Sequence, residues 1–294
     1  TLGGAVESAD VGAEASLYVR PETRGLAEAL GLEAVYPSRE HSSQLFVGGR
    51  MQAMPKGTLM GVPGDPRALD GILSADEIAR AEAEQLTPAS ADDVSVGDFI
   101  ASRLGDAVVD KVLDPLIGGV YSGRCRDLSM QATVPALLQA HRDGTSVLET
   151  VRDALAARTA TSGANVPGTQ KKSAPPVFMT LRGGISALIT ALAEDVRSRG
   201  GQINTGAQAV SANRADDGWQ VVFAGGEQVR ADDLIIAVPA YAAAEILRGE
   251  APRAAQLLAE VPYASSAVIT AVLDLAEPLG GSGVLIPPTC LLYT

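Results

Sequence analysis

Histidine and cysteine, which commonly carry catalysis or bind metals, are few and far apart in this 294-residue chain. The two histidines, His41 and His141, lie one hundred residues apart, and neither has a cluster of carboxylates or cysteines beside it. Cys125 and Cys290 form no C-x-x-C pair, so neither a zinc site nor a disulfide framework is supported. The Gly-x-Ser-x-Gly elbow of hydrolases is absent from the sequence. We therefore assign no catalytic side chain and no metal ligand.

Glycine-rich turns near the start of the chain suggest a chemistry in which the backbone, rather than a side chain, contacts a ligand. Leu2-Gly3-Gly4 is followed by a second turn at 11–15, where small residues allow a close approach to the backbone. Glycine pairs are also common in ordinary turns, and that alternative stays open on spacing alone. The G-x-G-x-x-G pattern, which places a pyrophosphate at a helix N-terminus, is not in this sequence.

The most distinctive part of the sequence is the stretch 97–135. Apolar residues recur four apart along it, which predicts an amphipathic helix that buries a broad face. Ser95 with Asp98 gives the start signal of this helix, and Gly118-Gly119 is predicted to end it. A second helix is expected near Ser129. By themselves these residues predict only a buried helical hairpin.

Further helices and strands are expected around this block. A β-hairpin turns at Gly48-Gly49, and Ser74 with Glu77 forms a capping box in a helix over 66–85. The stretch 156–176 has no periodicity and predicts a mobile loop. The remaining predictions are helices at 20–31, 186–199, 241–247 and 253–258, and strands at 178–182, 208–211, 219–223, 227–230, 233–239 and 264–275, with 233–239 a parallel strand buried on both faces.

Composition narrows the class of protein. With a net charge of -12 and a pI near 4.6, the chain lacks the clustered Lys and Arg of a nucleic-acid-binding surface. No apolar run reaches the roughly 18 residues that a membrane-spanning helix needs, and no signal peptide opens the chain. We expect a cytoplasmic protein, or one peripheral to the membrane without stable insertion. Its two ends are typical of an internal fragment.

Three motifs carry a resemblance to a known family. They read F-x-x-x-R-x-G-x-x-V from Phe99, D-P-L-x-x-G-V-Y-x-G from Asp114 and L-S-x-x-A-T-x-P from Leu128. Together they resemble the flavin-dependent porphyrinogen oxidases, and the likeness extends over nearly the whole chain, including the strand GSGVLIP at 281–287. The L-x-G-G-x-x-x-L turn from Leu181 is similar to one that recurs in FAD oxidases and desaturases.

The resemblance implies an α/β fold, in which a doubly wound FAD-binding domain of the amine-oxidase-like superfold, here incomplete, carries a helical insertion and a β-rich substrate domain. The expected partition is an FAD-binding domain at 1–35 and 177–240, a substrate-binding domain at 36–65 and 241–294, a helical domain at 66–154 and a flexible loop at 155–176. The helical domain would cap the porphyrin site.

The resemblance also implies where ligands bind. FAD would be contacted mainly through the backbone, and Arg20 is a candidate to pair with a substrate propionate, although a solvated surface arginine is an equal alternative. The residues expected to contact FAD are Ala5, Gly12, Ala13, Glu14, Ala15 and Ala209.

The implied activity is oxidation of coproporphyrinogen III, or of protoporphyrinogen IX, with O2 as acceptor in haem biosynthesis. The acidic composition and Ser43, which lies near a point where eukaryotic members carry an arginine, favour coproporphyrinogen. The flavin would supply the hydride acceptor, which agrees with the lack of a catalytic side chain. Another flavoprotein of the superfold, an amine oxidase or a carotenoid desaturase, and an inactive binding fragment are the alternatives. Oligomeric state and haem-pathway partners stay open.

Overall fold

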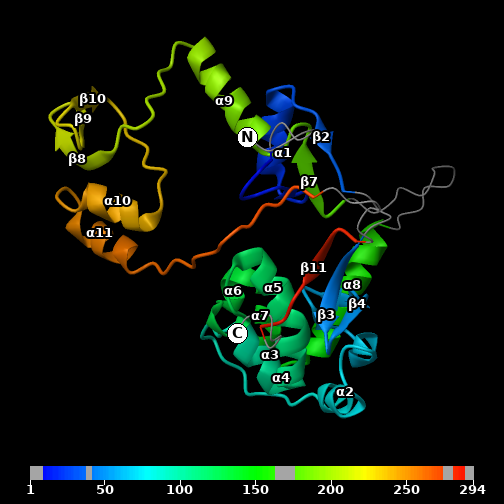
Figure 1. The fold of residues 1–294 in the computed structure, drawn as a ribbon. Coiled ribbons are helices and arrows are strands. Elements are labelled where there is room, and N and C mark those ends of the chain that lie inside the picture. Colours follow the sequence, from blue (N-terminus) through cyan, green and yellow to red (C-terminus); the bar gives the residue numbers. More distant parts are fainter. Residues whose placement is uncertain (1–8, 38–41, 163–175, 274–280, 289–294) are drawn as a thin grey trace. The chain divides into compact units, whose positions relative to one another are not determined.

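The computed structural model describes residues 9–37, 42–162, 176–273 and 281–288, and its elements are shown in Figure 1. The chain divides into two compact units. The first comprises residues 1–21, 35–180 and 266–294, and the second comprises residues 22–34 and 181–265. Each unit mixes helices with small sheets.

The first unit is dominated by helices. They are α2 (Ala75–Glu82), α3 (Val96–Leu104), α4 (Asp106–Val108), α5 (Asp114–Tyr121), α6 (Met130–Thr133), α7 (Pro135–Asp143) and α8 (Val147–Ser162). Three serines begin helices as predicted, because the side chains of Ser74, Ser95 and Ser129 each accept a backbone N–H three residues on. The backbone N–H of Ser74 in turn donates to the carboxylate of Glu77, which completes a capping box.

The central helix differs from the prediction of one continuous helix ending at Gly118-Gly119. It breaks at Gly105, whose φ of 97° lies outside the helical region, and then passes through a π-helical turn at Val109–Leu113. α5 continues through the glycine pair to Tyr121 and ends at Ser122, which adopts the left-handed conformation with φ 53°. The prediction failed because glycines end a helix only where the backbone must turn.

A continuous hydrophobic core lies beneath these helices. It joins helices α2 to α8 to the strands β3 (Ser43–Val47), β5 (Thr58–Leu59) and β6 (Val62–Pro63). The motif-bearing helices supply most of it, since their apolar faces point inward as their spacing predicts. Its fully buried members include Leu45, Val62, Leu69, Val96, Ile100, Val108, Val112, Leu113, Ile117, Met130, Leu137, Val147 and Val151.

A small mixed sheet flanks the helices. β3 pairs antiparallel with β4 (Arg50–Ala53) through a turn at Gly48-Gly49, both left-handed, which confirms the predicted hairpin. β11 (Gly283–Leu285), from the far end of the chain, adds in parallel to β3, with Leu285 opposite Leu45. Figure 1 shows β11 beside β3 and near α5. The sheet therefore brings 281–288 to the helical part.

A further small sheet consists of three short strands. β1 (Ser16–Leu17) pairs antiparallel with β7 (Phe178–Leu181), and the sheet order is β1-β7-β2, with β2 at Ala34–Val35. The hydroxyl of Thr180 donates to the carbonyl of Glu14 at 2.7 Å. This bond holds the coil before β1 against β7.

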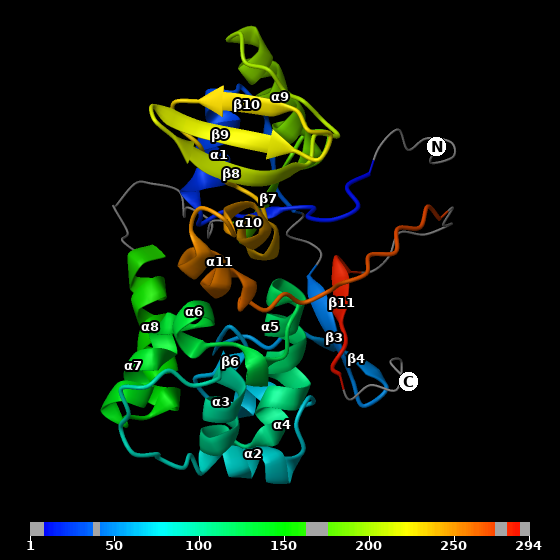
Figure 2. The same ribbon diagram turned by 90° about the vertical axis from the view of Figure 1, so that its left-hand side faces the viewer.

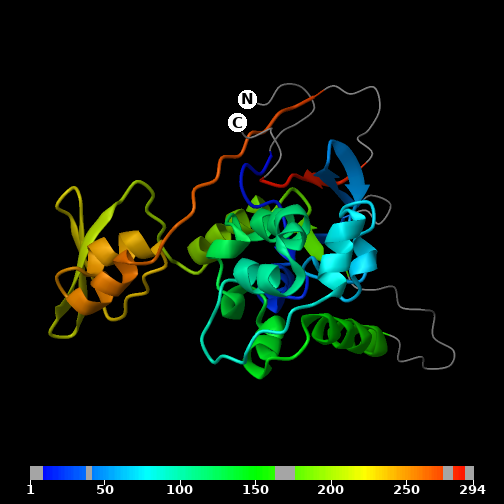
Figure 3. The same cartoon turned by 90° about the horizontal axis from the view of Figure 1, so that it is seen from below.

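The second unit contains a three-stranded antiparallel sheet of β8 (Ala209–Ala215), β9 (Gly218–Phe223) and β10 (Gln228–Ala231), in the order β10-β9-β8. α10 (Ala240–Leu247) and α11 (Pro252–Ala259) pack on each other beside this sheet (Figures 2 and 3). α1 (Pro21–Ala29) and α9 (Ser186–Ser198) complete its helices. The strands at 208–230 and these helices agree with the sequence predictions.

Two predicted strands are wrong. Residues 233–239 and the described part of 264–275 have no strand hydrogen bonding, and Ile235 and Ile269 are 89% and 94% exposed. An extended segment becomes a strand only when a neighbour accepts its backbone hydrogen bonds, and none does so among the described residues.

Helix boundaries need two corrections. The helix predicted over 66–85 is a short 3-10 turn at Pro66–Leu69 followed by α2, because the left-handed Gly71 separates them. The loop predicted from 155 begins later, since α8 runs to Ser162. Alanines favour helix there even without an apolar face. The rest of that loop, 163–175, lies outside the described residues.

Candidate functional site

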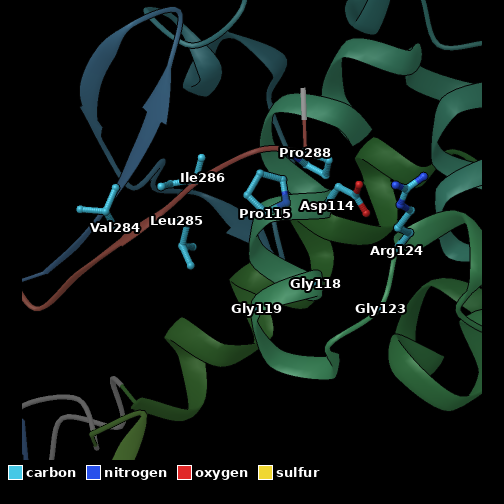
Figure 4. Close-up of a pocket in the computed structure, with 10 residues that line it drawn as sticks. All are labelled: Asp114, Pro115, Gly118, Gly119, Gly123, Arg124, Val284, Leu285, Ile286 and Pro288. Carbon is cyan, nitrogen blue, oxygen red and sulfur yellow. The ribbon is translucent and has the colours of Figure 1, made fainter. Parts of the chain in front are cut away.

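A pocket of about 550 Å³ in the first unit is formed by two segments far apart in the sequence. One is α5 with the turn that follows it, and the other is β11 with the residues after it. Figure 4 shows the two segments facing each other across the pocket. The lining residues are Asp114, Pro115, Gly118, Gly119, Gly123, Arg124, Val284, Leu285, Ile286 and Pro288.

The glycine pair of α5 allows both segments to come close to the helix. A Cβ placed on Gly118 would lie 3.1 Å from the carbonyl oxygen of Gly123, and one on Gly119 would lie 3.3 Å from Cδ2 of Leu285. Both distances are tighter than ordinary contacts. The missing side chains therefore let the turn and β11 pack against α5 and shape the pocket.

Asp114 fixes the turn that carries the polar side of the pocket. Its Oδ1 accepts the backbone N–H of Cys125 at 2.7 Å. Cys125 itself is fully buried, and this burial, followed by the negative charge of Asp114, raises the pKa of its thiol far above its usual range. A protonated, buried thiol is not a nucleophile, so Cys125 has a structural role.

Two arginines of this turn differ in their partners. Arg126 contacts the carboxylates of Asp106 at 2.7 Å, Asp110 at 3.3 Å and Asp98 at 3.4 Å. Its hydrogen bond with Asp106, together with the other two, raises the pKa of its guanidinium. Arg124 is exposed, and within the described residues its side chain forms no hydrogen bond or ion pair. Both arginines line a second, smaller pocket of about 290 Å³ with Asp110, Asp114 and Pro288.

The F-x-x-x-R motif serves the interior of the protein rather than the pocket. Arg103 is fully buried, its guanidinium lies 5.1 Å from the centre of the Phe99 ring, and its Nη1 lies 3.4 Å from Oε1 of Glu84. Glu84 also accepts the hydroxyl of Ser146 at 2.6 Å and the backbone N–H of Val147 at 2.8 Å. One buried carboxylate therefore joins α3 to the first turn of α8.

Four of the predicted FAD-contacting residues are exposed, and Ala209 is half-buried. Gly12, Ala13, Glu14 and Ala15 lie in the coil before β1, and a Cβ on Gly12 would meet nothing within 4 Å. Ala209 begins β8 in the second unit, opposite Phe223. Ala5 lies outside the described residues.

Arg20 is exposed immediately before α1, where its backbone N–H donates to the carbonyl of Leu17. It is not among the residues that line the pocket. The role of Arg20 and the FAD contacts stay predictions.

The remaining candidates for chemistry have structural roles or no description. His141 is nearly buried, its Nε2 donates to the carbonyl of Asp92 at 3.1 Å, and its ring packs edge-on against Phe99. His41 falls outside the described residues. Within the described ranges, no group of three metal-ligating side chains comes together, and no helix is long and apolar enough to cross a membrane.

Sequence reasoning missed the two charged residues of the pocket. Asp114 opens the D-P-L-x-x-G motif, to which the sequence alone assigns no side-chain role, and no motif marks Arg124. The signal was available in part, because the D-P-L-x-x-G block and the strand at 281–287 had each been linked to the family. Only the parallel pairing of β11 with β3 shows that they face one pocket.

Comparison with known proteins supplies the family. Residues 4–276 match the family of flavin containing amine oxidoreductases. A coproporphyrinogen III oxidase from Mycobacterium bovis is 33% identical over 97% of this chain and 59% of its own length. A protoporphyrinogen oxidase from Macaca fascicularis is 28% identical over 89% of this chain and 54% of its own.

Solved structures support the same fold. A protein from Exiguobacterium sp. 255-15, named as a candidate protoporphyrinogen oxidase, superposes with a TM-score of 0.64 at 22% identity, over 83% of this chain and 52% of that one. The chain thus spans little more than half the length of these proteins. The predicted amine-oxidase-like fold and the resemblance to porphyrinogen oxidases are confirmed, and the chain belongs to the family of flavin-containing amine oxidoreductases.

Proposed function

We propose that this chain is part of an FAD-dependent enzyme of haem biosynthesis that oxidises coproporphyrinogen III to coproporphyrin III with O2 as acceptor. The observation that carries the proposal is the pocket, because its two walls are the D-P-L-x-x-G block and the G-V-L-I-P strand. Both segments are the ones that resemble the porphyrinogen oxidases. Two of the similar proteins are named coproporphyrinogen III oxidase and protoporphyrinogen oxidase, which supports a porphyrinogen as the substrate.

The pocket offers surfaces that suit such a substrate. Leu285 presents an apolar side chain toward α5, whose facing wall has no side chains at Gly118 and Gly119. Such a surface suits a pyrrole ring. When bound, the flavin supplies the hydride acceptor. The chain's own residues bind and orient the macrocycle and exclude water. No side chain is proposed as a general acid or base.

We expect FAD to be contacted by Gly12, Ala13, Glu14, Ala15 and Ala209. Ala5, which belongs to the same expectation, lies outside the described residues. The open backbone at Gly12 is compatible with a ligand held by peptide groups, and the bond from Thr180 to Glu14 keeps this coil in place. Arg20 is proposed at the edge of the substrate. The FAD-binding, substrate-binding and helical regions set out from the sequence belong to the same proposal, as do a cytoplasmic location and haem-pathway partners.

A side-by-side oxidation assay tests the proposal. The purified chain is incubated in air with FAD and either coproporphyrinogen III or protoporphyrinogen IX, and porphyrin fluorescence and hydrogen peroxide are recorded. Heat-denatured protein controls for spontaneous oxidation. We expect coproporphyrinogen to be oxidised faster. A preference for protoporphyrinogen would change the substrate, and turnover of primary amines or a carotenoid without either porphyrinogen would replace the proposal by an amine oxidase or a desaturase.

A further inference from the structure

We propose that Arg124 binds a carboxylate of the substrate and so selects for tetrapyrroles that carry propionate arms. This inference rests on the proposed function and adds a specificity residue to it. Among the described residues, Arg124 is the cation that faces the 550 Å³ pocket. A guanidinium is well suited to a carboxylate because it presents parallel donors in one plane.

The partners of the two turn arginines support this assignment. Arg126, two residues along the chain, has its charge matched by three aspartates. Arg124 has no such partner within the described residues and lies on the side of the turn that lines both pockets. An exposed arginine without a partner keeps its full capacity to bind an anion. The turn therefore separates a structural arginine from one available to a ligand.

The backbone places Arg124 at the pocket rather than in open solvent. The left-handed Ser122 ends α5 and reverses the chain, and Gly123 packs its carbonyl oxygen against Gly118. The hydrogen bond from Cys125 to Asp114 then fixes the residue that follows. Arg124 is thus anchored on both sides, so little backbone ordering is needed when a ligand binds.

The charges of the pocket predict that removal of Arg124 strongly weakens the binding of a carboxylate ligand. Asp114 faces the same pocket, and Figure 4 shows its carboxylate beside the Arg124 side chain. Arg124 brings a positive charge to this pocket without forming an ion pair with Asp114. Without Arg124, the carboxylate of Asp114 remains and repels the carboxylates of a ligand. A cationic amine would show the opposite preference, since it would gain from the loss of Arg124.

Binding of coproporphyrin III, the stable oxidised macrocycle, tests this inference without requiring turnover. Fluorescence titrations compare the wild-type chain with Arg124→Ala and Arg124→Lys. The control is Arg50→Ala, which removes an exposed positive charge of the same unit away from the pocket. We expect Arg124→Ala to weaken binding by about tenfold or more, Arg124→Lys to restore part of it and the control to change it less than about twofold.

The tetramethyl ester of coproporphyrin III gives the readout that a merely structural role would not move. It keeps the macrocycle but has no carboxylate, so we expect wild type and Arg124→Ala to bind it equally. An unchanged affinity of Arg124→Ala for the acid, or an equal loss for acid and ester, overturns the inference while the proposed function stands. Absence of binding and turnover in the wild type overturns both. Arginine-dependent binding of the acid without any oxidation of coproporphyrinogen overturns the function alone.

Discussion

The helical stretch 66–155 and the two apolar stretches 233–239 and 264–273 are all rich in large hydrophobic residues, yet only the first is buried. In the helical stretch Ile100, Val112 and Ile117 are fully inaccessible, whereas Ile235 and Ile269 are almost fully exposed. The difference lies in the backbone. A helix satisfies its hydrogen bonds within its own segment, while a strand needs a neighbour before its side chains can pack. Hydrophobic pattern alone therefore predicts burial more safely for a helix than for a strand.

Loss of the buried ion pair between Arg103 and Glu84 should destabilise the helical stretch more than any other change proposed here. In Glu84→Ala, the Arg103 charge would stay buried without its partner, and the N-terminus of α8 would lose its acceptor. We expect a loss of about 3–5 kcal/mol in the free energy of unfolding, measured by urea denaturation followed by circular dichroism. The matched control is Glu82→Ala, which removes an ion pair with the exposed Arg67 and should cost far less, because solvent screens an exposed pair. Equal losses in the two variants would refute the structural role of Glu84.

Backbone packing gives the next largest effect. A Cβ on Gly97 would lie 2.6 Å from the backbone nitrogen of Arg126, so α3 or the turn at 125–127 would have to move. We expect Gly97→Ala to lower stability by about 1–3 kcal/mol. The control, Gly225→Ala, adds a methyl group in the β9-β10 turn of the second unit, where nothing lies within 4 Å, and should be close to neutral. A neutral Gly97→Ala would show that α3 and this turn are less closely packed than described.

The exposed apolar stretches should show the smallest effect. Ile269→Gln replaces a side chain that is 94% exposed, so we expect a stability change within about 0.5 kcal/mol. The same substitution at the fully buried Ile100 should cost about 3 kcal/mol or more. A loss above about 1 kcal/mol at Ile269, measured by the same urea denaturation, would mean that this stretch is packed in solution.

The sequence predicted those parts of the fold that depend on neighbouring residues. Ser74, Ser95 and Ser129 begin helices because a hydroxyl and a backbone N–H three residues on determine the cap. The hairpin at Gly48-Gly49 follows in the same way. The break at Gly105 and the continuation of α5 through Gly118-Gly119 were missed, because glycine permits either outcome and packing decides.

The site was predicted only in its parts. The D-P-L-x-x-G block and the strand at 281–287 were recognised separately, but their shared pocket depends on β11 pairing with β3 across more than two hundred residues. Arg124 had no distinguishing pattern, because its importance comes from having no partner while Arg126 has three. Such a difference between two arginines of one turn is a tertiary property.

The buried Cys125 makes the turn between the two arginines observable. Its thiol is inaccessible and held protonated by burial, so an alkylating reagent reacts with it only while the turn is detached from the core. With Cys290 replaced by serine, the rate of alkylation at fixed pH measures how often this wall of the pocket opens. A ligand bound to Arg124 would lower the rate at which Cys125 is alkylated. Alkylation of Cys125, measured with and without ligand, would therefore report how firmly this turn is held against the core.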